Sequence, residues 1–221
     1  MSTTNQPQIK YIRETGMASN SFIISGDNYN YLVDPSQEFK VSATKDTGKP
    51  TDPPVFDAIL LTHGHFDHIR SLNKFRSKNT PVYIHTDDGI FLTDQQYNLS
   101  GLFGQPTTYD PAEHLLQDGS VIDLAPELKA TLLHTPGHTP GSSCFLLTFN
   151  ETPFALFSGD TIFMDSIGRT DFPGGNSSQM KASLEKIKKW AVDWPEDLPV
   201  FSGHGPVAPI SQILKYNMWL K

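Results

Sequence analysis

The chain has 221 residues, of which 37% are hydrophobic and 19% charged, a balance typical of a folded globular protein rather than of a disordered one. Its net charge of −7 disfavours a nucleic-acid-binding or membrane-surface protein, because such partners require clustered lysine and arginine. The single cysteine, Cys144, excludes an internal disulfide and suits a reducing compartment.

Residues 1–10 have neither the basic nor the apolar region of a signal peptide, and no apolar run reaches the length of a membrane span, so we expect a soluble cytoplasmic protein.

The first part of the chain predicts β structure. Apolar runs separated by a Gly-Asp-Asn turn predict a hairpin. The expected elements that follow are a polar loop over 37–54, with a short helix as an alternative for its start, a strand over 57–61, a helix over 67–74 and a strand over 81–85.

The second part alternates strands with helices. Residues 91–114 show little periodicity. Strands are expected near 121–122, 128–133, 143–149, 154–158 and 198–202, and helices over 177–190 and 209–220. No linker composition divides the chain, so we predict one α/β domain spanning residues 1–221.

The most informative segment is HGHFDH at 63–68, which places three imidazoles and a carboxylate within six positions. With 8 histidines in 221 residues, such a pattern arises by chance roughly once in a few thousand chains. Neutral imidazole and carboxylate are ligands that suit zinc, iron or manganese. A surface histidine cluster is the alternative, and the apolar strand directly before the segment disfavours it.

Three later residues could complete a metal site. His138 lies in HTPGHTPG, Asp160 in FSGD and His204 in SGHGP, and each has glycine neighbours that let a loop approach a metal closely. His85, His114 and His134 could bind a metal by residue type alone, but we interpret them as structural histidines.

The ordered motifs HxHxDH, PGHT, SGD and GHG resemble the metallo-β-lactamase superfamily, and most closely its glyoxalase II-like (hydroxyacylglutathione hydrolase-like) small hydrolases. This resemblance implies a four-layer αβ/βα sandwich with two metal ions at one edge. It assigns His63, His65 and His138 to the first metal, places Asp160 as a bridge, and assigns to the second metal Asp67, His68 and His204. The bridging Asp160 is the glyoxalase II pattern, which true β-lactamases lack.

The resemblance also implies a reaction. Two divalent ions, most simply zinc with iron or manganese as alternatives, would hold a bridging hydroxide that attacks a thioester or ester of a small molecule. Asp67 and Asp160 would help to orient that hydroxide. Asp34 would accept a ring N–H from a ligand histidine, with a plain turn aspartate before proline as the alternative. Cys144 is expected to be a core thiol.

Substrate contacts are predicted from two segments. Arg169 lies in GRTDFPGG, which resembles a motif of the same small hydrolases, so it would hold a substrate carboxylate. A structural salt bridge with Asp171 is the alternative. Phe91, Tyr97 and Phe103 lie in the unpatterned segment and are expected to border the entrance, or else to pack on the core.

Seventeen residues follow His204, too few for the C-terminal helical domain that helps typical glyoxalase II to bind glutathione, so we expect none. Three alternatives to a thioester hydrolase stay open. One is a persulfide dioxygenase with a single iron held by His63, His138 and Asp160. The others are a lactonase of the same fold and a nonenzymatic metal-binding protein. The acidic charge disfavours a nuclease.

Overall fold

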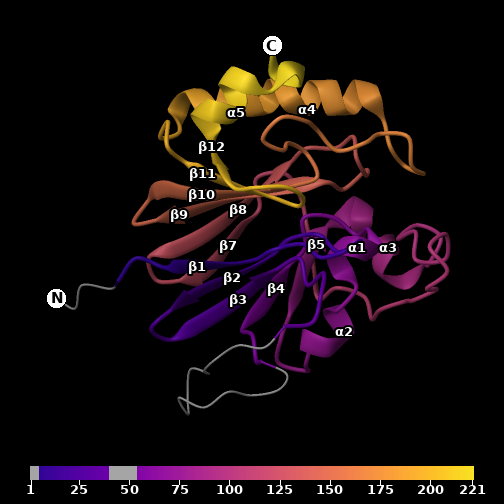
Figure 1. Cartoon of the computed structure of the whole chain (residues 1–221). Helices are drawn as coiled ribbons and strands as arrows, with labels where there is room; N and C mark the ends of the chain where they lie inside the picture. Colours follow the sequence, from indigo (N-terminus) through magenta and orange to yellow (C-terminus); the bar gives the residue numbers. More distant parts are fainter. Residues whose placement is uncertain (1–4, 40–53) are drawn as a thin grey trace.

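The computed structural model describes residues 5–39 and 54–221, in which strands form two six-stranded sheets (Figure 1). The first sheet has the order β1 (Gln8–Ile12), β2 (Ser21–Gly26), β3 (Tyr29–Val33), β4 (Ala58–Leu60), β5 (Val82–His85) and β6 (His114–Leu116). The second has the order β12 (Ala208–Pro209), β11 (Pro199–Ser202), β10 (Thr152–Gly159), β9 (Ser143–Phe149), β8 (Leu128–His134) and β7 (Val121–Ala125). Both sheets are mixed: β3, β4, β5 and β6 run parallel, and so do β10 and β11.

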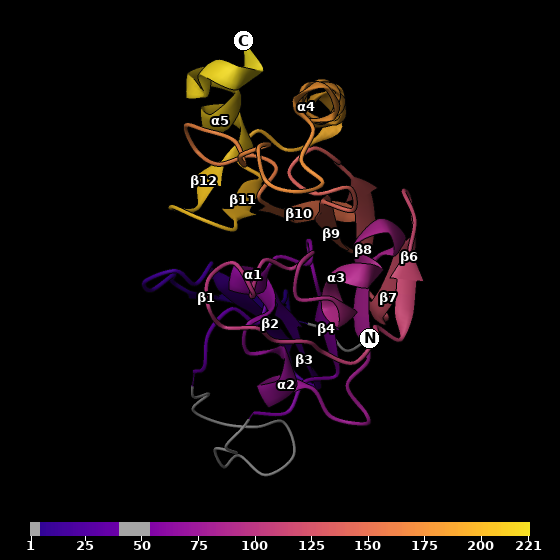
Figure 2. The same cartoon turned by 90° about the vertical axis from the view of Figure 1, so that its right-hand side faces the viewer.

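Helices cover the outer faces of the two sheets. They are α1 (Phe66–Ile69), α2 (Leu72–Phe75), α3 (Gly89–Thr93), α4 (Ser177–Trp190) and α5 (Ile210–Tyr216), with 3-10 turns η1 (Thr86–Asp88), η2 (Ala191–Asp193) and η3 (Met218–Leu220). Figures 1 and 2 show α4 and α5 over the second sheet, while α1, α2 and α3 lie with the first. The side chain of Asn176 caps α4 by accepting the N–H groups of Ser178 and Gln179.

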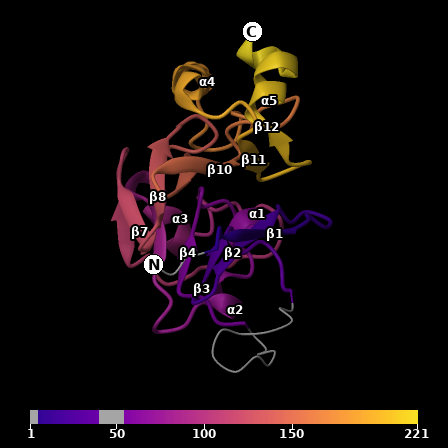
Figure 3. The same ribbon diagram turned by 90° about the vertical axis from the view of Figure 1, so that its left-hand side faces the viewer.

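The two-residue period of the strands sorts their side chains into separate layers. On β9, Phe145 and Leu147 face the core between the sheets, whereas Cys144 packs with the apolar face of α4. On β4, Leu60 faces the same central core, and Ile59 faces the helices outside the first sheet. Helices, sheet, sheet and helices therefore form four layers, which confirms the predicted αβ/βα sandwich (Figure 3).

The strands that the sequence predicts, and helix α4, lie where they are predicted, but two predicted helices are shorter than expected. The helix expected over 67–74 is broken at Ser71, whose N–H donates to the carbonyl of Pro35 instead of continuing the helix. The helix expected over 209–220 ends at Tyr216, because Asn217 adopts an extended backbone before η3.

Other differences concern short elements. The weakly patterned segment 91–114 includes part of α3 and the start of β6, and β1 and β12 were not predicted. Most of the polar loop expected over 37–54, including much of its alternative short helix, lies outside the described residues, and 37–39 are not helical. Within residues 5–39 and 54–221, no helix is long and apolar enough to cross a membrane.

Candidate metal centre

The candidate ligands all follow strands and meet where the two sheets approach each other. His63 and His65 lie in the loop after β4, and Asp67 and His68 begin α1. The second sheet contributes the remaining ligands from the loops after β8, β10 and β11: His138, Asp160 and His204. Strands β3 to β5 run parallel, as do β10 and β11, so their carboxyl ends share one edge of each sheet.

The structure brings all seven predicted ligands together, six of them in two groups of three and Asp160 between the groups. The ligand atoms of His63, His65 and His138 lie within 4.8 Å of one another, and so do those of the second group, Asp67, His68 and His204. Asp160 lies between the groups: one oxygen is 3.2 Å from Nε2 of His68, and the other is 3.5 Å from Nε2 of His138 and 3.7 Å from Nε2 of His204. Asp160 can therefore contact ions in both positions.

Most of the ligand rings are oriented by a second contact. Nδ1 of His68 lies 2.8 Å from the carboxylate of Asp34, as the sequence predicts, and Asp34 also accepts the N–H and hydroxyl of Thr62. Nδ1 of His138 lies 2.7 Å from the backbone oxygen of Arg169. Nδ1 of His204 lies 2.7 Å from Glu14. Each acceptor fixes the ring so that Nε2 faces the other ligands.

The inward-facing atoms fit a metal ion. Nε2 of His63 and Nε2 of His65 are buried and have no hydrogen-bond partner among the described residues. Nε2 of His68 and Oδ1 of Asp160 are also buried, and they face each other at 3.2 Å without forming a hydrogen bond. A buried polar atom without a partner is unfavourable, and a cation bound by imidazole nitrogens and carboxylate oxygens would remove that penalty. The residues present thus match the donor set of a borderline divalent metal.

The charges of the site point the same way. Burial, reinforced by the neighbouring histidines, lowers the pKa of His63 well below its ordinary value and that of His65 to about 3, so both rings are neutral as metal ligands must be. Burial would also lower the pKa of His68, but Asp160 and Asp34 raise it well above its ordinary value. His204 behaves alike: burial would lower its pKa, but Asp67 and Asp160 raise it to about 9. The carboxylates therefore favour positive charge at the centre, and a bound metal ion would replace the protons that they stabilise on His68 and His204.

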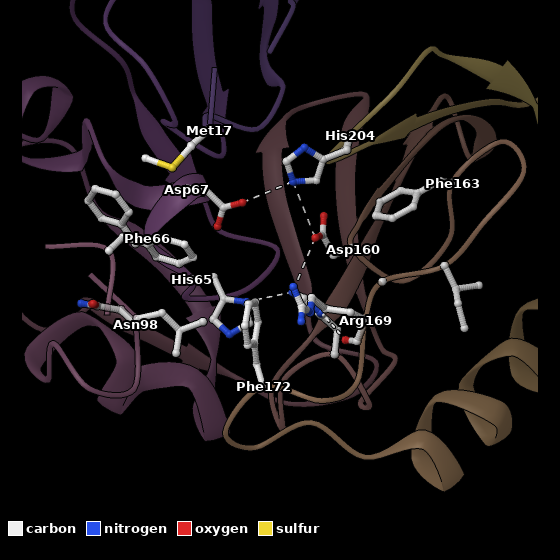
Figure 4. Close-up of a pocket in the computed structure, with 15 residues that line it drawn as sticks. Met17, His65, Phe66, Asp67, Asn98, Asp160, Phe163, Arg169, Phe172 and His204 are labelled. Carbon is white, nitrogen blue, oxygen red and sulfur yellow. Dashed lines mark hydrogen bonds and ion pairs between the residues drawn. The ribbon is translucent and has the colours of Figure 1, made fainter. Parts of the chain in front are cut away.

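A cavity of about 420 Å³ opens onto these ligands (Figure 4). His65, Asp67, His138, Asp160 and His204 line it from the metal side. Aromatic and apolar side chains form much of the remaining wall: Met17, Phe66, Phe103, Phe163, Ile167 and Phe172. The ligand edges thus face a hollow whose other walls are largely apolar, the usual composition of a small-molecule site.

The three predicted entrance aromatics are placed differently from one another. Phe103 lines the cavity and is partly exposed. Phe91 is buried under the site, where its ring lies 5.8 Å from that of His65 and its side chain fills the space beside Gly64. Tyr97 is exposed and packs on Phe91, with ring centres 5.6 Å apart. Phe91 and Tyr97 do not line this cavity.

Arg169 forms the salt bridge with Asp171 that the sequence offered as an alternative, and its side chain also lines the cavity. Its guanidinium forms two hydrogen bonds to Asp171, at 2.7 and 2.6 Å, and lies 3.8 Å over the ring of Phe172. The side chain is nevertheless 56% exposed and lines the cavity. A salt bridge at this exposure is easily exchanged for another anion.

Several residues of the site were not predicted from the sequence. Glu14 contacts His204 across 190 positions of the chain, and no motif marks it. Met17 and Phe163 line the cavity from segments without a recognisable pattern. Phe172 belongs to the GRTDFPGG motif, so its place beside Arg169 could have been inferred from that motif.

His85, Asp87 and His134 form a further group of potential ligands, away from the cavity. The rings of His85 and His134 stack with centres 3.8 Å apart and an angle of 10°. Parallel rings direct their in-plane lone pairs side by side rather than toward one point, and Nε2 of His134 already donates to the carbonyl of Pro140. We interpret this pair as stacked structural histidines.

The stacked pair predicts a pH dependence of stability. Burial, followed by the neighbouring His134, lowers the pKa of His85 from 6.5 to about 4. Between these pH values the unfolded chain binds more protons at His85, so the contribution of His85 to the free energy of unfolding should fall as the pH drops, by about 2 kcal/mol at about pH 5 relative to pH 7. His85→Gln should reduce this fall, measured by urea unfolding of metal-free protein. Equal losses in variant and wild type would contradict the assignment.

Glu14 gives a prediction for metal affinity. In a His65→Ala background, which leaves only the position formed by Asp67, His68 and His204, Glu14→Gln should weaken zinc binding by about 10–100-fold, because an amide oxygen orients the ring less strongly than a carboxylate. Competition with a chelator measures the affinity. Glu38→Gln is the matched control, since Glu38 is 69% exposed and pairs with Lys74. Equal affinities for the two variants would refute the role of Glu14.

Comparison with known proteins supports this picture. Residues 15–193 match the family model of the metallo-beta-lactamase superfamily. The probable metallo-hydrolase YqgX of Bacillus subtilis is 41% identical over 152 residues, 67% of this chain and 68% of that protein. Hydroxyacylglutathione hydrolase GloC of Haemophilus influenzae is 28% identical over 165 residues, 73% of this chain and 74% of that protein.

Solved structures agree on the fold. The BLEG-1 B3 metallo-beta-lactamase has a TM-score of 0.80 and 32% identity, over 97% of this chain and 100% of that one. TTHA1623, solved in a di-iron-bound form, has a TM-score of 0.72 and 26% identity, over 96% and 100%. ETHE1 from Myxococcus xanthus, at 20% identity and a TM-score of 0.68 over 96% and 83%, shows the shared fold alone. The chain belongs to the metallo-β-lactamase superfamily.

Proposed function

We propose that this chain is a binuclear metallohydrolase that cleaves a thioester, or a related ester, of a small acidic molecule. The observation that carries the proposal is the pair of ligand groups joined by Asp160 at the wall of one cavity. Two groups of ligands suit two ions, and the cavity has the size of a small-molecule site. The superfamily contains hydrolases, and the name of GloC supports a thioester as the bond that is cleaved.

Two divalent ions would be held by His63, His65 and His138 on one side and by Asp67, His68 and His204 on the other, with Asp160 between them. Zinc fits these ligands, and iron is supported by the di-iron form of TTHA1623. When bound, such ions supply an activated water molecule at neutral pH and polarise a carbonyl oxygen.

The protein's own residues prepare the site for this reaction. Burial would raise the pKa of Asp160, but His68 and then His138 and His204 lower it, so this carboxylate stays ionised and can orient a water molecule as an acceptor. Asp67 borders the cavity beside it and offers a second carboxylate. The apolar wall around Phe163 and Phe172 would pack against the acyl group and limit access of bulk water.

A thiol leaving group suits this arrangement. A thiol has a pKa of about 8.5 and leaves as a thiolate without a general acid. Among the residues that the structure describes, the titratable groups lining the cavity are Arg169 and the ligand carboxylates and histidines. Cleavage of a thioester needs no free general acid, so it suits this lining. The alkoxide that leaves an ordinary ester would instead need a proton from solvent or from a ligand.

A thioester assay of metal-reconstituted protein tests the proposal. Thiol release from a hydroxyacyl thioester of glutathione should be abolished by a chelator and restored by zinc or iron. Two further substrates separate the alternatives: a glutathione persulfide with an oxygen electrode, and a β-lactam because of the likeness to BLEG-1. Oxygen consumption with one iron per chain, or β-lactam hydrolysis without thioester hydrolysis, would contradict the proposal.

Arg169 provides a test of substrate charge. Arg169→Ala should leave metal content unchanged and lower kcat/KM for a carboxylate-bearing thioester by about 10–150-fold, the range for a hydrogen bond to a charged group, mainly through KM. A neutral thioester should be cleaved equally by variant and wild type.

Asp171→Asn is the matched control, because it removes the salt bridge but keeps the guanidinium at the cavity. It should preserve activity on the acidic substrate. If both variants lose activity on both substrates and melt at lower temperature, Arg169 has a structural role and the proposed preference for an acidic substrate is contradicted.

A further inference from the structure

Asp88 is a fully buried carboxylate just behind the metal centre. It ends η1, which follows β5, and its side chain has no solvent exposure. One oxygen accepts the N–H of Gly64 at 2.9 Å and the hydroxyl of Thr139 at 2.8 Å. The other accepts the N–H of Gly141 at 2.7 Å. The carboxylate thus has three donors and does not line the cavity.

These three donors belong to two loops that supply one ligand group. Gly64 lies between His63 and His65, and Thr139 directly follows His138. The loops come from different sheets, and their ligands meet where Nδ1 of His65 lies 2.8 Å from Nε2 of His138. The Asp88 side chain therefore joins the two segments that carry all three ligands of the first metal position.

The second position has separate supports. Its ligands lie on α1 and in the loop after β11, and His68 and His204 are oriented by Asp34 and Glu14. The Asp88 carboxylate accepts its hydrogen bonds from the other two loops. Loss of Asp88 would therefore affect the two positions unequally.

The loop around Gly141 is fitted closely to the carboxylate. A Cβ at Gly141 would lie 2.6 Å from Oδ1 of Asp88 and 2.6 Å from its backbone nitrogen, so a residue with a side chain cannot occupy this place. This close packing and the hydrogen bond from Gly141 fix the distance between the loop and the Asp88 carboxylate.

We propose that Asp88 is a positioning residue for the first metal position, setting the separation of the His63/His65 loop from the His138 loop. This inference rests on the two-metal centre of the proposed function. The contact requires that both carboxylate oxygens of Asp88 accept hydrogen bonds. Asparagine has the same shape, but either orientation of its amide would place an NH2 group against the N–H of Gly64 or of Gly141.

Two variants, each lacking a ligand of one metal position, serve as backgrounds in which zinc binding at the other position is measured. His204→Ala removes a ligand of the second position, and His65→Ala removes one of the first. Zinc affinity is measured in each by competition with a chelator. Adding Asp88→Asn should weaken binding by about 10–100-fold in the His204→Ala background, the usual effect of an outer contact, and by less than about twofold in the His65→Ala background. Asp87→Asn, at the exposed neighbouring residue, should change neither.

A milder variant keeps the test valid if Asp88→Asn folds poorly. Thr139→Val removes one of the three donors and preserves side-chain volume. It should weaken the first position measurably, but by less than the roughly 10–100-fold expected for Asp88→Asn, because the N–H groups of Gly64 and Gly141 still hold the carboxylate. Circular dichroism of the metal-free proteins checks that each is folded.

Equal losses in the two backgrounds, or no loss with either variant, would overturn the role of Asp88. Failure of the proposed function gives a different result. A wild type that binds a single ion would contradict the binuclear hydrolase, while the comparison in the His204→Ala background would still measure the effect of Asp88 on its own position.

Discussion

The buried negative charge of Asp160 is the constraint on which the rest of the centre depends. A carboxylate removed from water is stable only if positive charge or hydrogen bonds compensate it. Imidazoles from helix α1 and from two loops approach its two oxygens, at 3.2 Å for His68, 3.5 Å for His138 and 3.7 Å for His204. Because Oδ1 makes no hydrogen bond among the described residues, the proposed pair of cations would complete the charge balance that the histidines begin.

The sandwich fold makes this convergence possible because its strands end at the site while their side chains fill other layers. Central-core residues such as Leu60 and Phe157 hold the sheets together, and the loops that follow β4 and β10 are left free to carry ligands. Carboxylates outside the ligand set then orient the site: Asp34 acts on His68, Glu14 on His204, and Asp88 on the loops of the first position. Each acts through a fixed hydrogen bond, so geometry is set before any ion binds.

Local signals predicted much of this arrangement. The mixture of strands and helices predicted an α/β domain, and the HxHxDH segment after an apolar strand predicted a metal site. The four-layer sandwich and the convergence of all seven ligands were predicted from the resemblance of the ordered motifs to the metallo-β-lactamase superfamily. Contacts between distant segments could not be predicted: Glu14 reaches His204 across 190 positions, and Ser71 ends a predicted helix through its bond to Pro35. Phe91 is apolar in a weakly patterned segment, and only the tertiary structure shows that it packs beneath His65 instead of facing the cavity.

Metal content is the most direct test of a binuclear centre built around Asp160. After reconstitution and removal of loosely bound metal, elemental analysis of the wild type should give two ions per chain. Asp160→Ala should lower that number and abolish thioester hydrolysis, because it removes the carboxylate shared by the two positions. A wild type that holds one ion per chain and hydrolyses the thioester at full rate would contradict the account.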